Sequence, residues 1–152
     1  MISFVCPGPG DTANLAARLA PLLRPGDIII LCGQLGSGKT LFTGGLAAGL
    51  GVEEPVTSPS FVLVREYRSG FLPLIHADIY RLTSRNEFDD LDLIPQALEG
   101  VLVIEWGDAI EQMLPNDHLR IDIDVDEDDG SRRISLHPSG AWASRLPGEM
   151  AS

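Results

Sequence analysis

Residues 33–40 read Gly33-Gln34-Leu35-Gly36-Ser37-Gly38-Lys39-Thr40, and this stretch decides the fold that we predict. Its spacing, G-x-x-x-x-G-K-T, is the Walker A pattern of phosphate-binding loops. The glycines let the backbone curl with positive φ and approach a ligand closely, so that the amides form a nest for an anion. Lys39 can then reach the β- and γ-phosphates of a nucleotide, and Thr40 can offer its hydroxyl to Mg²⁺. The nucleotide-binding residues expected in this loop are Gly33, Leu35, Gly36, Ser37, Gly38, Lys39 and Thr40.

The residues on both sides of the loop support this interpretation. Asp27 to Cys32 form a short, β-branched and almost entirely apolar run, which is typical of a strand covered on both faces. Thr40 to Leu50 carry apolar residues at helical spacing, and Gly51 is a stop signal. A real phosphate loop needs this order of strand, loop and helix, because the helix N-terminus adds its positive end to the site. The alternative, a glycine-rich turn that only resembles the motif, would not require it.

The length and composition are those of one globular domain. A chain of 152 residues can bury a real core, and 44% hydrophobic with 22% charged residues is ordinary for a soluble protein. No apolar run is long enough to span a bilayer, and the N-terminus lacks the regions of a secretion signal. The two cysteines do not indicate a disulfide framework. We therefore expect a cytoplasmic protein with no membrane partner.

The net charge bears on possible partners. It is −11, from 22 acidic and 11 basic residues. Proteins that bind nucleic acid on their own usually have a basic patch, so we expect no strong direct RNA binding. If this protein serves an RNA-linked process, another subunit is expected to hold the RNA. The acidity itself is explained most simply by solubility.

The remaining pattern predicts a mixed sheet. Phe61 to Tyr67 and Phe71 to Ala77 are strands joined by a short turn, so they must be antiparallel. Val101 to Ile104 read as a buried strand, and the alternating stretch Leu119 to Asp126 returns through a turn as a hairpin. Ser3 to Val5 are expected as an edge strand. We predict an α/β fold, a P-loop NTPase-like three-layer sandwich with a mixed parallel and antiparallel central sheet.

Helix signals complete the expected fold. Asp11 or Thr12 caps a first helix that Pro21 kinks or ends, and Cys6 to Gly10 should be irregular. Glycines in the second helix indicate close packing on the sheet, with functional mobility as the alternative. Ser84 to Glu87 form a capping box. We expect a single domain over residues 1–137 and a poorly ordered C-terminal tail over residues 138–152.

Two acidic residues follow predicted strands and are candidates for chemistry. A Walker A loop needs a second acid to hold Mg²⁺, and Glu105 after the strand Val101 to Ile104 fits that role. The alternative for Glu105 is an ordinary surface acid. Asp78 also ends a strand, and it can bind metal through water or orient the attacking water. The candidate catalytic residues are Lys39, Asp78 and Glu105, and the candidate metal ligands are Thr40 and Glu105.

Four further residues have competing interpretations. Ser58 and Ser60 lie where switch I lies in nucleotide hydrolases, so a hydroxyl there can sense the γ-phosphate or can simply cap a turn. Trp106 borders the nucleotide or a partner surface, or is a core residue. For His76, a hydrogen-bonded strand residue is favoured over a catalytic base or metal ligand, because no second His or Cys has ligand spacing to it.

Four motifs taken together resemble one family. They are the loop Gly33 to Thr40, Ser58-Pro59-Ser60-Phe61, His76-Ala77-Asp78-Ile79-Tyr80-Arg81-Leu82, and Glu105-Trp106. In this order they look like the TsaE family, the ATPase subunit of the bacterial machinery that makes threonylcarbamoyladenosine on tRNA. The resemblance covers nearly the whole chain. Walker A alone is shared by many families, whereas the ordered set is specific.

The resemblance implies ATP hydrolysis with Mg²⁺ and association with partner subunits that transfer threonylcarbamoyl to adenosine 37 of tRNAs. It assigns phosphate binding to Gly36 to Thr40, and Mg²⁺ binding to Thr40 and Glu105. Asp78 falls on the family's active-site acid, and Ser60 falls on its switch-like hydroxyl. The start of the first helix, near Asp11, falls on the adenine side of the nucleotide pocket.

The chain departs from the family pattern at three positions. The family usually has Asp where Gln34 stands, Thr where Ser60 stands, and Pro where Gly107 stands. Ser60 keeps a hydroxyl. With Gln34 in place of Asp, a charge beside the phosphates is missing. We expect this to affect the turnover rate rather than phosphate binding.

Two other functions remain as alternatives. A small-molecule P-loop kinase needs an acceptor region and arginines over the phosphates, and the pairs Arg65/Arg68 and Arg81/Arg85 are too few and scattered for this. The second alternative is a nucleotide-binding switch with little hydrolysis. Turnover without a small-molecule acceptor distinguishes an ATPase from a kinase.

Overall fold

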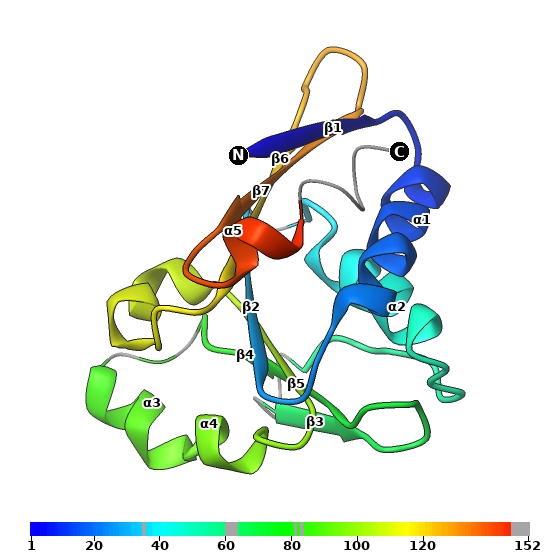
Figure 1. Cartoon of the computed structure of the whole chain (residues 1–152). Helices are drawn as coiled ribbons and strands as arrows, with labels where there is room; N and C mark the ends of the chain where they lie inside the picture. Colours follow the sequence, from blue (N-terminus) through cyan, green and yellow to red (C-terminus); the bar gives the residue numbers. More distant parts are fainter. Residues whose placement is uncertain (35, 60–63, 81, 83, 147–152) are drawn as a thin grey trace.

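The computed structural model describes residues 1–34, 36–59, 64–80, 82 and 84–146. Within them, one sheet of seven strands lies between two layers of helices (Figure 1). The strands are β1 (Ile2–Cys6), β2 (Asp27–Cys32), β3 (Val64–Tyr67), β4 (Leu74–Asp78), β5 (Val101–Glu105), β6 (Leu119–Val125) and β7 (Arg132–Pro138). The helices are α1 (Pro9–Leu19), α2 (Lys39–Gly49), α3 (Arg85–Leu91), α4 (Leu93–Gln96) and α5 (Trp142–Arg145), with the 3-10 helices η1 (Ala20–Leu22) and η2 (Gly107–Met113). None of these helices is long and apolar enough to cross a membrane.

The strand order is β1-β7-β6-β2-β5-β4-β3. The central strands β6, β2, β5 and β4 run parallel, whereas β1, β7 and β3 pair antiparallel with their neighbours. The predicted mixed sheet, the antiparallel β3–β4 pair and the β6–β7 hairpin are therefore confirmed. Residues 61–63, predicted as the start of β3, lie outside the described residues. Because the carboxyl ends of parallel strands meet at one edge, the polar residues that end β4 and β5 come together there.

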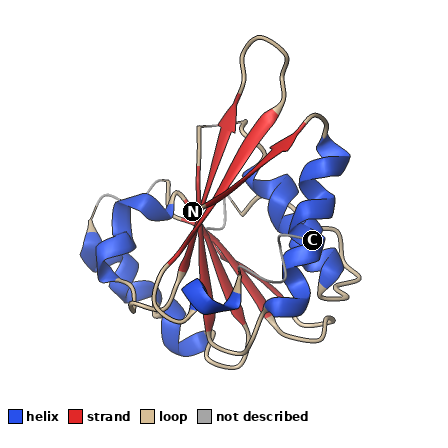
Figure 2. Ribbon diagram, turned by 45° about the horizontal axis from the view of Figure 1, so that its top comes forward, coloured by secondary structure: helices blue, strands red, loops and turns tan. Residues whose placement is uncertain are grey.

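Alternate residues of the central strands face opposite helical layers. In β2, Ile29 and Leu31 join the core beneath α1 and α2, whereas Ile28 and Ile30 join the core beneath α3 and α4. Figure 2 shows the sheet nearly edge-on between these layers. Burial on both faces explains why β2 is apolar along its whole length rather than alternating. The predicted three-layer sandwich is confirmed.

Two glycines of α2 allow the close approach of α1. A Cβ atom on Gly45 would lie 2.4 Å from the carbonyl oxygen of Ala13, and one on Gly49 would lie 2.9 Å from the carbonyl oxygen of Ala17. No side chain fits at such distances, so glycine is required at both positions. Packing therefore explains Gly45 and Gly49, but they pack against α1 and not against the sheet as predicted, and a Cβ atom on the third glycine, Gly44, would meet nothing within 4 Å.

The first helix begins earlier than predicted. Gly8 is its N-cap and Pro9 its first residue, and the Asp11 carboxylate accepts a hydrogen bond from the Gly8 amide at 2.9 Å. Proline is tolerated at the first helical position because its missing N–H would have no intrahelical partner there. Asp11 therefore acts three residues into the helix and reaches back, instead of being the cap itself. The regular helix ends at Leu19, and Pro21 lies in η1, as its backbone chemistry predicts.

Two segments in the middle of the chain also differ from expectation. β4 begins at Leu74 rather than Phe71 and continues to Asp78, and Phe71 is exposed in the preceding turn. The 3-10 helix η2, which follows β5, was not predicted, because its seven residues are too few to show a helical period. The cap of α3 agrees with prediction, since Ser84 Oγ accepts a hydrogen bond from the Glu87 amide.

The C-terminal segment differs from the expected poorly ordered tail over residues 138–146. β7 continues to Pro138, and α5 places Trp142 and Leu146 in the core on the α1 side of the sheet. The Arg145 guanidinium donates to Asp27 Oδ2 at 2.6 Å and so ties α5 to the start of β2. One helical turn with two apolar residues shows no periodicity in a sequence, which is why the pattern missed it. Residues 147–152 lie outside the described residues.

Candidate functional site

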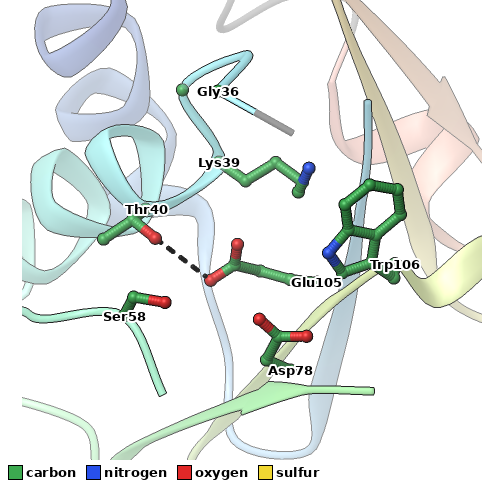
Figure 3. A pocket seen from close by; sticks show the side chains of 8 residues that line it. Gly36, Lys39, Thr40, Ser58, Asp78, Glu105 and Trp106 are labelled. Atoms are coloured by element: carbon green, nitrogen blue, oxygen red, sulfur yellow. Dashed lines mark hydrogen bonds between the residues drawn. The ribbon is translucent and has the colours of Figure 1, made fainter. Parts of the chain in front are cut away.

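A cavity of about 230 Å³ lies where β4 and β5 end and α2 begins, and we call it the phosphate-loop cavity. Figure 3 shows side chains from these elements pointing into the same space. The residues that line it are Gly36, Gly38, Lys39, Thr40, Ser58, Asp78, Glu105 and Trp106. The cavity thus brings together most of the residues that the sequence singled out, from four separate segments of the chain.

The two candidate acids are neighbours because of sheet register. β4 and β5 are parallel, and Asp78 pairs directly with Glu105 at their carboxyl ends. Both side chains are buried, with 6% of Asp78 and 3% of Glu105 exposed. The Tyr80 amide donates to Asp78 Oδ1 at 2.9 Å. The sequence predicted each acid at the end of a strand. The register of β4 and β5 shows in addition that the two acids lie side by side.

Lys39 is buried beside these acids. Its Nζ donates to the carbonyl oxygens of Gly33 at 2.7 Å and Gln34 at 3.0 Å, and it lies 3.8 Å from the centre of the Trp106 ring. Burial lowers the pKa of the Lys39 ammonium below its ordinary value, and the negative charges of Glu105 and Asp78 oppose this shift. A buried cation held by carbonyl dipoles at the mouth of an amide nest is suited to an anionic ligand.

The donor set around Glu105 fits magnesium. Thr40 Oγ1 donates to Glu105 Oε2 at 3.3 Å, so a hydroxyl oxygen and a carboxylate already lie next to each other. Mg²⁺ prefers such hard oxygen ligands, and it is commonly bound by one or two carboxylates plus the phosphates of a substrate. In the part of the chain that the structure describes, no group of three or more His, Cys, Asp or Glu side chains is arranged to hold a metal ion.

A second cavity of about 280 Å³ lies on the other side of the loop, at the start of α1. It is lined by Cys6, Pro7, Gly8, Pro9, Thr12, Ser37, Gly38, Leu41, Gly130 and Arg132. The predicted adenine-side residue Asp11 is not among the described residues that line it, because the Asp11 carboxylate is turned back to the Gly8 amide. The adenine-side role that the resemblance implies for the start of the first helix, near Asp11, stays a prediction.

Arg132 joins the loop to the β6–β7 hairpin, and sequence reasoning missed it. Its Nε donates to the Ser37 carbonyl at 2.8 Å, and its Nη2 lies 3.5 Å from the Gly36 carbonyl oxygen. These residues are more than ninety positions apart in the chain. An arginine directly after a hairpin turn has no spacing relation to the loop, so only the strand order β7-β6-β2 brings it there.

The other predicted residues are distributed around these cavities. Ser58 lines the phosphate-loop cavity, as a switch-like hydroxyl requires. Gly33 lies against a third cavity, between the loop and the polar face of β6, and a Cβ atom there would lie 2.6 Å from the Ile123 carbonyl oxygen. Leu35 and Ser60 lie outside the described residues, so their predicted roles stay predictions.

Trp106 and His76 had open interpretations. Trp106 is half-buried and lines the cavity between Lys39 and Tyr80, whose ring centre lies 4.8 Å from its own. It therefore borders the site on one side and packs against the core beneath α3 and α4 on the other. His76 is fully buried in β4, and its Nε2 lies 2.5 Å from Glu105 Oε2. The predicted hydrogen-bonded strand residue is confirmed.

A sequence model described as "Threonylcarbamoyl adenosine biosynthesis protein TsaE" matches residues 6–134. The chain belongs to the TsaE family. The match runs from the end of β1 into β7, so it includes the phosphate loop, both acids of the cavity and Arg132. The family that the four motifs resembled is therefore confirmed.

Curated TsaE relatives and a solved structure agree with this assignment. Proteins named tRNA threonylcarbamoyladenosine biosynthesis protein TsaE are 44% identical in Streptomyces coelicolor, over 86% of this chain and 93% of the relative, and 42% identical in Bacillus subtilis, over 87% and 82%. The crystal structure of Bacillus subtilis YdiB superposes with a TM-score of 0.81 at 34% identity, covering 99% of this chain and 93% of that one. The TsaE fold thus extends over the whole described chain.

Proposed function

We propose that this chain is a Mg²⁺-dependent ATPase that supports threonylcarbamoyl transfer to adenosine 37 of tRNA as one subunit of a cytoplasmic multi-protein complex. The observation that supports this most directly is the convergence of Lys39, Thr40, Asp78 and Glu105 in one cavity beside the loop glycines. The relatives named for threonylcarbamoyladenosine biosynthesis supply the process. The net charge of −11 favours partners, rather than this chain, as the holders of the RNA.

Each residue has a proposed task in ATP binding. The loop amides and the N-terminus of α2 hold the phosphate oxygens, and the Lys39 ammonium turns from the Gly33 and Gln34 carbonyls toward the β- and γ-phosphates. The cavity formed by the start of α1 and Arg132 takes the nucleoside side of ATP. The chain thus binds the two ends of the nucleotide on opposite sides of Gly38, which lines both cavities.

Hydrolysis is assigned to the two acids. Thr40 and Glu105 would hold Mg²⁺, which would supply positive charge beside the transferred phosphoryl group. Asp78 lies beside Glu105 at the same edge of the sheet, where it orients the attacking water by accepting its proton in a hydrogen bond. Ser58 lines the wall opposite these acids and senses the γ-phosphate. Water and metal placement of this kind supplies most of the catalysis in phosphoryl transfer.

Partner dependence tests the proposal. We expect slow ATP turnover by the isolated chain, no dependence on any small-molecule acceptor, and clear acceleration when the other subunits of the threonylcarbamoyl-transfer complex are added. Coupling is reciprocal, so an ATP analogue should also strengthen binding to those subunits relative to ADP. Turnover and partner affinity are measured with ATP analogue, ADP and no nucleotide. Equal affinity in all three states and unchanged turnover would contradict the proposal, and turnover only with an acceptor would favour a kinase.

A further inference from the structure

His76 is a fully buried imidazole beneath the phosphate-loop cavity. None of its side chain is exposed, and its Nε2 lies 2.5 Å from Glu105 Oε2. Among the described residues, its Nδ1 has no hydrogen-bond partner. A buried polar atom without a partner is costly, so a residue that serves only to fill space at this position would be apolar. The imidazole therefore needs an explanation beyond packing.

Strand register places His76 one step below the two acids. His76 pairs with Val103 in β5, and the next side chains on the same face of the sheet are Asp78 and Glu105. Asp78 and Glu105 line the cavity, whereas His76 does not. The imidazole thus contacts the carboxylate from behind, and it can act on a ligand in the cavity only through Glu105.

The hydrogen-bond chemistry assigns the donor. An ionised carboxylate can only accept, so the hydrogen in the contact with Glu105 is on His76 Nε2. The Thr40 hydroxyl donates to the same oxygen, Oε2, and neither of these bonds uses Oε1. Two donors from β4 and α2 therefore fix the orientation of the Glu105 carboxylate, with one of its oxygens left for a further ligand.

We propose that His76 is a positioning residue that orients the Glu105 carboxylate for Mg²⁺ by donating a hydrogen bond from Nε2 to Oε2. This inference rests on the proposed metal role of Glu105. Partners of this kind, behind a ligating carboxylate, typically change metal affinity by about 10-fold to 100-fold when they are replaced. His76 itself contacts neither the metal nor the nucleotide.

Matched substitutions separate the hydrogen bond from the volume of the side chain. His76→Leu keeps a similar volume and removes the donor, whereas the amide of His76→Gln can still donate to Glu105. His137→Gln is the control, because this half-exposed histidine lies on the distant strand β7 and bonds Asp122 of β6. Binding of Mn²⁺ in the presence of ATP is measured by electron paramagnetic resonance, and binding of ATP in EDTA is measured by calorimetry.

The expected result is a metal-specific loss. His76→Leu should weaken Mn²⁺ binding by about 10-fold to 100-fold and leave ATP binding in EDTA unchanged, while His76→Gln and His137→Gln stay near the parent. A folded His76→Leu with parent affinity for Mn²⁺ would overturn the inference, as would equal losses in His76→Leu and His76→Gln. If the parent itself binds no Mn²⁺ with ATP, the proposed function fails instead.

Nuclear magnetic resonance of the parent chain provides a test that does not depend on a variant folding. With ¹⁵N-labelled histidine, the ring nitrogens report which of them carries the hydrogen. A hydrogen on His76 Nε2 in a short hydrogen bond supports the inference. A neutral ring with its hydrogen on Nδ1 alone overturns it, because Nε2 could then only accept and could not donate to Glu105.

Discussion

Two groups of ionisable side chains lie on the same sheet in different surroundings. One is the phosphate-loop cavity with Lys39, Asp78 and Glu105. The other, which we call the β6 network, includes side chains from η2, from β6 and the residue before it, and from β7. Its members are Glu111, His118, Arg120, Asp122 and His137. Both groups mix acids and bases, so the comparison shows what burial and pairing do to similar residues.

In the β6 network, each basic side chain contacts an acidic one. Arg120 donates to Glu111 at 2.8 Å and to Asp122 at 3.0 Å, and His118 lies 3.0 Å from Glu111. The side chains of Arg120 and Glu111 are 32% and 28% exposed, so water shares the solvation of these charges. These side chains bond one another without a ligand, and the contacts of Glu111 join η2 to the sheet.

In the phosphate-loop cavity, the acidic and basic side chains are more deeply buried than in the β6 network, and they line the same cavity. The Lys39 ammonium donates to backbone carbonyls rather than to the adjacent acids, and Glu105 receives its hydrogen bonds from His76 and Thr40. Burial lowers the pKa of Lys39, which shows that its charge costs stability there. The difference indicates that the β6 network serves stability, whereas the cavity holds charges for a ligand.

Loss of Glu105 should give the largest effect. We expect Glu105→Ala to lower ATP turnover by about 100-fold to 1000-fold, because the metal-associated carboxylate acts on the charge of the transition state. The melting temperature should also fall, because the substitution leaves the buried His76 Nε2 without its acceptor, so turnover is measured at a temperature where the variant is folded. Turnover and thermal unfolding are measured together. The matched control is Glu111→Ala in the β6 network, which should leave turnover unchanged, and parent turnover in a folded Glu105→Ala would show that Glu105 is misassigned.

Loss of Lys39 should weaken nucleotide binding without weakening the fold. Lys39→Met removes a charge-assisted phosphate contact of about 1.5–3 kcal/mol, so nucleotide affinity should fall by about 10-fold to 100-fold. Because burial lowers the Lys39 pKa, the charged form disfavours folding, and the variant should unfold no more easily than the parent. Calorimetry measures the affinity, and urea titration measures the free energy of unfolding. Unchanged nucleotide affinity in the folded variant would contradict the site assignment.

The smallest expected effect is on the pH dependence of stability in the β6 network. Burial raises the pKa of Glu111, but hydrogen bonds and charges from His118 and Arg120 outweigh it and hold the pKa below its ordinary value of 4.5. A lowered carboxyl pKa stabilises the fold above that ordinary value, and the stabilisation is lost as the pH falls through the folded pKa. Glu111→Gln should therefore cost up to ~1 kcal/mol near neutral pH and progressively less below pH 4.5.

Urea unfolding of the parent and of Glu111→Gln at several pH values checks this prediction. The two curves of unfolding free energy against pH should converge on the acid side. Curves that stay parallel throughout would mean that Glu111 contributes through packing and not through its charge. Turnover should be the same in both proteins, because the network lies outside the phosphate-loop cavity.

The sequence alone was sufficient for features that depend on neighbouring residues. The loop Gly33 to Thr40, the buried strand before it and the helix after it follow from glycine chemistry and from periodicity. The β6–β7 hairpin follows from alternation and a turn, and the mixed sheet follows from the short connection between β3 and β4. Ordered motifs were also sufficient to recognise the TsaE family, and the catalytic roles of Asp78 and Glu105 stay predictions.

Features that depend on strand order and register were decided only by the tertiary structure. Nothing in the spacing of the chain says that β4 lies beside β5 with Asp78 opposite Glu105, or that His76 supports Glu105 from below. The contact of Arg132 with the loop and the burial of Trp142 in α5 are of the same kind. The physical reason is that turns, caps and the periodicity of apolar side chains depend on residues close together in one segment. Which segments lie next to each other, by contrast, depends on side-chain packing and strand pairing over the whole fold.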